Sequence, residues 1–119
     1  MKAICICGLL VAALPAAGSE PLALSVTPAQ SFAPATLHVR ARIEPHGANR
    51  ALALIVDGAD FYRSSELPLD GDQAPKTVEM SIRSVPAGEY IVSGVLVDAV
   101  GHQRAIAHQA IRVLGELSQ

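Results

Sequence analysis

The sequence predicts an all-β protein, a single Greek-key sandwich of two sheets with roughly seven strands. Three observations lead to this expectation. Short runs of residues alternate between apolar and polar side chains, as in strands with one buried face. Turns rich in Pro, Gly and Asp separate these runs, and no stretch shows a helical period. Two packed antiparallel sheets are the simplest arrangement that buries one face of every strand.

The first eighteen residues have the features of a secretory signal peptide. Lys2 supplies a basic start, residues 3–14 are apolar, and small residues extend to Gly18. We therefore expect a signal peptide over 1–18, a mature domain over 19–119, and a periplasmic or secreted location. The apolar run is shorter than the roughly 20 residues that span a bilayer, so no membrane insertion is expected after cleavage. Cys5 and Cys7 leave with the signal, so we expect no disulfide.

The composition limits the classes of partner. The chain has 119 residues and a formal net charge of −2, with its Lys and Arg residues scattered along it. This pattern argues against binding to nucleic acid, which needs a basic patch. No sequence motif for a cofactor is present, so none is predicted. The expected partner is another envelope protein or a second copy of this chain.

The first two strands differ in how clearly they alternate. Leu22–Thr27 is a candidate strand that ends at Pro28. A turn-rich stretch through Phe32 and Pro34 follows it. Residues 37–43 then alternate most clearly, with apolar side chains predicted inward and charged or His side chains outward. We expect a half-exposed antiparallel strand there.

The middle of the chain carries a strand that is apolar on both faces. Residues 51–56 contain only Ala, Leu, Ile and Val, which favours a strand that is central in its sheet or covered. One or two helical turns are the alternative for this run. Residues 61–65 are expected to form a short edge strand, and a loop should follow. Residues 77–83 then alternate, with Val78, Met80 and Ile82 inward.

A turn that leads directly into Tyr90 organises the rest of the chain. Pro86 fixes its own φ angle, and Gly88 tolerates a positive one, so the backbone can turn sharply before Tyr90. We expect a tyrosine corner, in which the Tyr90 hydroxyl bonds to the backbone a few residues upstream. The alternative is an ordinary half-buried tyrosine. The strand after Tyr90 should turn at residues 98–102 and return over 104–113.

Three short segments give the chain a family resemblance. They are Val85-Pro86-Ala87-Gly88-Glu89-Tyr90, Val92-x-Gly94-x-Leu96 and Asp98-Ala99-Val100-Gly101. In these the chain resembles immunoglobulin-like and fibronectin type III-like domains of bacterial secreted proteins. The resemblance implies an immunoglobulin-like sandwich. The function expected of this chain is a non-enzymatic role in protein–protein interaction or envelope assembly.

A narrower resemblance concerns copper. Tyr90-Ile91-Val92-Ser93 followed by Gly101-His102 looks like the closing part of periplasmic copper-resistance sandwich proteins. Those proteins also use a histidine at the mature N-terminus as a copper ligand, and no histidine stands near Gly18 here. Because this ligand is absent, metal binding is kept as the alternative function: a periplasmic protein that binds copper or another metal.

The candidate metal ligands are histidines. The chain has four of them, and no pair has the short spacing of a zinc motif. Solvated surface histidines are the simpler interpretation, and His102 with His46 or His108 is the metal alternative. Asp70 and Asp72 do not complete a calcium loop, and no nucleophile elbow accompanies the serines, so we expect no enzyme activity.

An excess of apolar residues predicts an interaction surface. If Tyr90 and Leu96 point inward, then Ile91, Val95 and Val97 point outward on the same strand, and Ile55 joins them from its neighbour. Monomeric proteins seldom leave such a patch exposed. The predicted surface is completed by a possible rim of Phe61, Tyr62 and Arg63. The alternative is that the N-terminal tail or the loop from Leu67 to Pro75 covers it.

Overall fold

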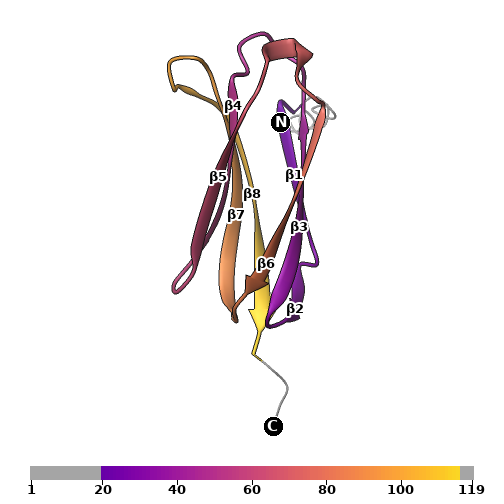
Figure 1. The fold of residues 1–119 in the computed structure, drawn as a ribbon, viewed down its shortest axis with the longest axis vertical. Helices are drawn as coiled ribbons and strands as arrows, with labels where there is room; N and C mark the ends of the chain where they lie inside the picture. Colours follow the sequence, from indigo (N-terminus) through magenta and orange to yellow (C-terminus); the bar gives the residue numbers. More distant parts are fainter. Residues whose placement is uncertain (1–19, 116–119) are drawn as a thin grey trace, which may run out of the picture.

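The computed structural model describes residues 20–115, which form eight strands and one short 3₁₀ turn (Figure 1). The elements in chain order are β1 (Leu22–Thr27), β2 (Gln30–Phe32), β3 (Ala35–Ile43), β4 (Ala51–Gly58), β5 (Tyr62–Pro68), η2 (Gly71–Gln73), β6 (Thr77–Val85), β7 (Gly88–Val97) and β8 (Gln103–Leu114). The prediction of an all-β chain is confirmed for this range.

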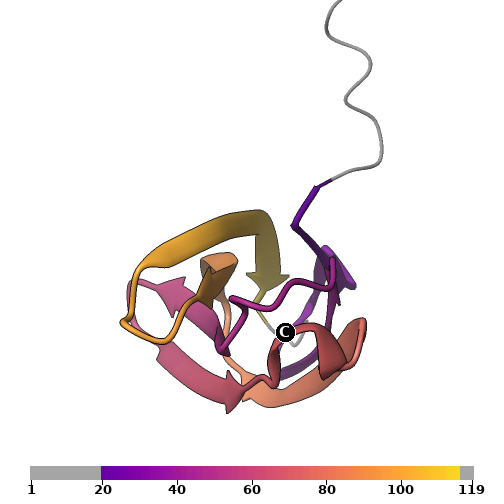
Figure 2. The ribbon, with the colours of Figure 1, turned by 90° about the horizontal axis from the view of Figure 1, so that it is seen from above.

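The strands form two sheets that face each other across one core. The smaller sheet has the order β1-β3-β6, and the larger one has the order β2-β8-β7-β4-β5. Every pairing is antiparallel except that of β2 with β8, which is parallel. Seen along the strands, the two sheets curve around a shared interior (Figure 2).

The alternation of side chains explains which face of each strand is buried. In β3 every second residue from Ala35 to Ile43 is buried and every residue between them is exposed. In β6, Val78 and Met80 are partly buried and Ile82 is buried, as expected. Strand β4 lies between β5 and β7, which confirms the central position predicted for its doubly apolar sequence.

Strand β2 is the element that the sequence did not predict. It has three residues between two prolines, too few to show a period, and it pairs with residues 112–114 at the end of β8.

A glutamine side chain of β8 joins the two sheets. The Gln109 side chain accepts from Val26 N at 3.0 Å and donates to Val26 O at 2.9 Å. It thereby satisfies backbone groups of β1 from the opposite sheet.

Tyr90 fills the end of the core where β7 begins. Its side chain is 3% exposed, and its hydroxyl donates to the carbonyl oxygen of Pro86 at 2.7 Å. This is the upstream backbone bond that the sequence suggests. The ring packs edge-on against Phe61, with centroids 5.9 Å apart and an interplanar angle of 85°.

The predicted signal peptide over 1–18 lies outside the described residues. Within residues 20–115 there is no helix with the length and apolar character needed to cross a membrane.

Candidate metal site

The turn between β7 and β8 projects from one end of the sandwich and is organised by Asp98 (Figure 1). The Asp98 Oδ1 atom accepts from the backbone N–H groups of Val100 at 3.0 Å and His102 at 2.8 Å. The Asp98 N–H group donates to the His102 carbonyl at 3.0 Å. Gly101 has a φ of 87°, which other residues rarely adopt. The turn therefore holds residues 98 and 102 beside each other.

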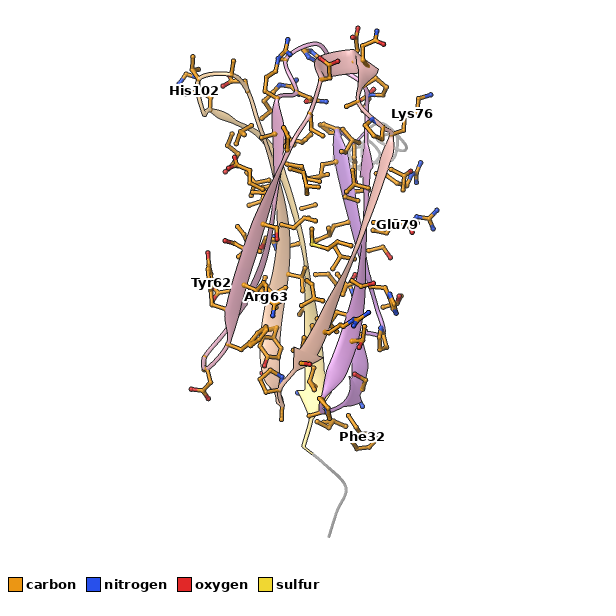
Figure 3. All side chains as sticks on the ribbon, viewed as in Figure 1. Phe32, Tyr62, Arg63, Lys76, Glu79 and His102 are labelled. Atoms are coloured by element: carbon orange, nitrogen blue, oxygen red, sulfur yellow. The ribbon has the colours of Figure 1, made fainter. Side chains whose placement is uncertain are left out.

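The side chains of Asp98 and His102 form a pair. His102 Nδ1 lies 3.6 Å from Asp98 Oδ2, and the His102 side chain is 79% exposed against 27% for Asp98. Figure 3 shows His102 at the tip of the turn, away from the core. The backbone hydrogen bond from His102 is the main cause that lowers the pKa of Asp98 below its ordinary value. The Asp98 carboxyl is therefore ionised at neutral pH.

The loop between β3 and β4 lies next to this turn. A surface hollow is lined by Gly47, Ala48 and Arg50 from the loop and by residues 98–100 from the turn. Arg50 N also donates to Val97 O at 2.9 Å. His46 belongs to the same loop, where its Nδ1 accepts from Ala48 N at 3.0 Å. The structure thus brings the segments of His46 and His102 to one end of the molecule.

Asn49 fixes this end of the molecule. It is fully buried, and its Nδ2 donates to the Glu44 carbonyl at 3.1 Å. Its Oδ1 accepts from Arg104 Nη1 at 2.5 Å, and its carbonyl accepts from Gly71 N at 2.9 Å. One buried residue therefore connects the β3–β4 loop and the start of β8 through its side chain, and the η2 segment through its backbone carbonyl.

The other two histidines lie elsewhere. His108 is exposed in β8, opposite Ser93 of β7. His38 is on the smaller sheet, where its Nδ1 lies 3.2 Å from Ser81 Oγ. Among the described residues, no three His, Cys, Asp or Glu side chains gather as a metal cluster. His108 lies within β8 and not in the turn that carries His102.

Sequence reasoning treated Asp98 only as a turn residue. The usable signal was the spacing of Asp98 and His102, four positions apart around a glycine. Alternation patterns concern strands, so they gave no reason to examine side chains within a turn.

The predicted apolar surface is present on the outer face of the larger sheet, but its rim differs from expectation. Ile91 is 44% exposed, and Ile55, Val95 and Val97 are half-buried. Tyr62 lies on the same face, since it pairs with Asp57, and Asp57 pairs with Ile91. Phe61 instead packs on Tyr90, and the Arg63 guanidinium lies 5.5 Å from the centre of the Phe61 ring. Of the three rim residues, Tyr62 alone belongs to this face.

Comparison with known proteins gives matches only among solved structures. No protein-family model matches the chain, and no curated protein matches it. The superoxide reductase (neelaredoxin) from Ignicoccus hospitalis matches with a TM-score of 0.57 at 14% identity, covering 79% of this chain and 80% of that one. A variant of the same protein matches with a TM-score of 0.56 at 15% identity, covering 79% and 82%. The chain shares the fold of these superoxide reductases.

These matches correct two expectations. The assignment to immunoglobulin-like or fibronectin type III-like secreted domains is wrong, because the matched structures are superoxide reductases. The expectation of a non-enzymatic interaction module, and of no enzyme activity, is overturned by the same finding, since this fold carries a redox enzyme in the matched proteins. The segments that suggested the family describe a turn before a tyrosine, and that local geometry does not identify a family.

Proposed function

We propose that this protein binds a divalent transition-metal ion at the β7–β8 turn, through His102 Nδ1 and Asp98 Oδ2. The observation that carries the proposal is the 3.6 Å approach of these two atoms in a turn that the backbone already holds in shape. Metal–ligand bonds of about 2.0–2.2 Å allow one ion to contact two donors at such a separation. An imidazole together with a carboxylate suits copper(II) and zinc.

The surroundings of the turn fit an open site. Both donors face solvent, and the described residues supply no third ligand in place, so water or a substrate would fill the other positions. His46 is on the adjoining loop, and it could bind the ion through Nδ1 only by giving up its bond from Ala48 N. When bound, the ion supplies Lewis-acid or redox chemistry. The protein positions its two donors and keeps one side accessible.

Calorimetric titration of the purified protein with copper(II) and with zinc tests this proposal. We expect one ion per chain, and loss of that binding in His102→Ala. Asp98→Asn should weaken binding by about tenfold or more, since the amide is a poorer ligand and no longer attracts the cation. His108→Ala is the matched control, because it removes another exposed histidine that lies in β8, away from the turn. Equal binding by His102→Ala and by the unchanged protein would refute the site.

A redox activity is the second candidate function. The observation that favours it is the fold shared with superoxide reductases over 79% of this chain. We expect protein loaded with copper to accelerate the decay of superoxide, and His102→Ala treated in the same way to match buffer alone. Metal binding without any effect on superoxide decay would refute the redox activity and leave the proposal of metal binding standing.

We also propose that the protein is exported to the periplasm or beyond, with residues 1–18 as its signal peptide. The basic start and the short apolar run support this. Mass spectrometry of the protein recovered from the envelope fraction should give a chain that begins near Ser19.

We propose that the two sheets are connected in a Greek-key topology. The connections β3–β4 and β5–β6 pass from one sheet to the other, which supports this proposal.

A further inference from the structure

The outer face of the larger sheet carries apolar side chains that no element of residues 20–115 covers. Ile106 is 51% exposed and Ile91 is 44% exposed. In Figure 1 the smaller sheet lies on only one side of the larger one. The residues that make up this outer apolar face are Ala51, Ala53, Ile55, Ile91, Val95, Val97, Ile106 and Ala110.

Two segments considered as covers of this face lie elsewhere. Leu69, in the loop after β5, is buried in the core, and its N–H group donates to Arg50 O at 2.9 Å, so the loop crosses the end of the sandwich. At the other side, Pro21 O accepts from Glu44 N at 3.0 Å, which places the start of the described chain on the smaller sheet.

The register arranges the face in rows that cross four strands. One row contains Glu66, Ala53, Val95 and Ile106, and the row beside it contains Ser64, Ile55, Ser93 and His108. A third row contains Tyr62, Asp57, Ile91 and Ala110. Large side chains therefore face small ones in four of the six mirrored pairs about a line between β4 and β7. The other two pairs set Glu66 against Ile106 and Asp57 against Ile91.

We infer that this face binds the same face of a second copy, around a twofold axis parallel to the strands and between β4 and β7. Such an axis places β5 of one copy over β8 of the other, and β4 over β7. Val95 then meets Ala53 of the second copy, and Tyr62 meets Ala110. Large side chains facing small ones allow two sheets to interdigitate at the usual spacing of about 10 Å.

The charges at the two margins fit this arrangement. The β5 margin carries Glu66, with Asp60 in the preceding turn, and the β8 margin carries His108 and Arg112. Arg112 also contacts Glu89 of its own chain at 3.1 Å, and both side chains are more than half exposed. The twofold axis brings the β5 margin of each copy to the β8 margin of the other, with Glu66 one row from His108. A face with this pattern is complementary to itself, as a symmetric dimer requires.

Light scattering after size exclusion tests the inference directly, and it does not depend on metal. We expect the mass of two chains for the unchanged protein. Val95→Glu should raise the dissociation constant of the dimer by about a hundredfold or more, because it buries a carboxylate without a partner. Val100→Glu is the control, since Val100 is 74% exposed in the β7–β8 turn and lies outside the face. A single-chain mass at every concentration would overturn the inference and leave the face to a different partner.

Disulfide cross-linking keeps the test decisive if Val95→Glu does not fold. In a background with Cys5→Ser and Cys7→Ser, protein with Tyr62→Cys is mixed with protein carrying Ala110→Cys and oxidised. The two positions are three strands apart within one copy, too far for one disulfide, and they face each other between copies. We expect a cross-linked dimer in this mixture. No product is expected from Tyr62→Cys alone or from its mixture with Ser81→Cys. Equal yields in all three samples would refute the arrangement.

Discussion

Tyr90 shows how one side chain can serve several elements at once. Its hydroxyl bonds to the backbone of the turn before β7, and its ring lies against Phe61, which directly precedes β5. Because the hydroxyl has a partner, the side chain is buried without leaving a polar atom unsatisfied. The residue thereby joins the turn, the first residues of β7 and the β4–β5 connection.

Replacing Tyr90 by Phe should remove one hydrogen bond and leave the ring in place. We expect the free energy of unfolding to fall by about 1 kcal/mol, the usual net value of such a bond, as the Pro86 carbonyl loses its donor. Urea unfolding measures the change. Tyr62→Phe is the matched control, since Tyr62 is 62% exposed and should lose little stability. Equal losses in the two variants would contradict this role.

Tyr90 should also make stability depend on alkaline pH. Burial, and secondly the negative charge of Asp60, raise the pKa of Tyr90 above its ordinary value of 10.0. As pH rises past that value the unfolded chain loses this proton first, so the folded state binds more protons and the free energy of unfolding declines. Urea midpoints at about pH 9 and pH 11 should show a larger decline for the unchanged protein than for Tyr90→Phe. Parallel declines would argue against this assignment.

At the scale of the element, β4 ends at a glycine for a steric reason. A Cβ atom on Gly58 would overlap the Tyr90 ring, which lies directly against this position. We expect Gly58→Ala to destabilise the protein by about 1–3 kcal/mol, the usual cost of overpacking. Thermal unfolding is the measurement. Gly47→Ala is the control, because nothing lies within 4 Å of a Cβ atom there.

The loops beside the β7–β8 turn depend on Asn49. Asn49→Ala would leave the Glu44 carbonyl without its side-chain donor and Arg104 without its acceptor. We expect a loss of about 1–3 kcal/mol in the free energy of unfolding, together with weaker metal binding as the β3–β4 loop loosens. Hydrogen exchange at residues 46–50 should accelerate, whereas exchange in β3 should not. Unchanged exchange in the loop would show that other contacts hold it.

Most strands could be predicted because apolar and polar residues alternate along a strand that has one buried face and one exposed face. The alternation in β3 and the doubly apolar sequence of β4 each indicated one position in the sandwich, and both predictions were confirmed. Strand β2 is too short to show a period, so its pairing with β8 depends on contacts far apart in the chain.

The candidate site could be predicted only in part. His102 was recognised as a possible ligand, but alternation contains no information about which loops meet at the end of a sandwich. His46 and His108 therefore looked equally suitable as its partners, although His108 lies in the middle of a strand. Asp98 came to notice only when the hydrogen bonds of its turn were known.

At the scale of the whole molecule, metal binding should stabilise the entire fold. An ion that binds only the folded chain adds about 2.7 kcal/mol at a free concentration one hundred times its dissociation constant. We therefore expect copper(II) or zinc to raise the thermal midpoint of the unchanged protein. His102→Ala should show no such rise, while His108→Ala should respond normally. A rise of equal size in His102→Ala would assign the effect to another site.

The bonds between Gln109 and Val26 join residues 83 positions apart, and β2 similarly depends on the final residues of β8. These partners exist only once β8 has joined the larger sheet. Strands β1 and β2 therefore take their last contacts from the end of the domain that is made last.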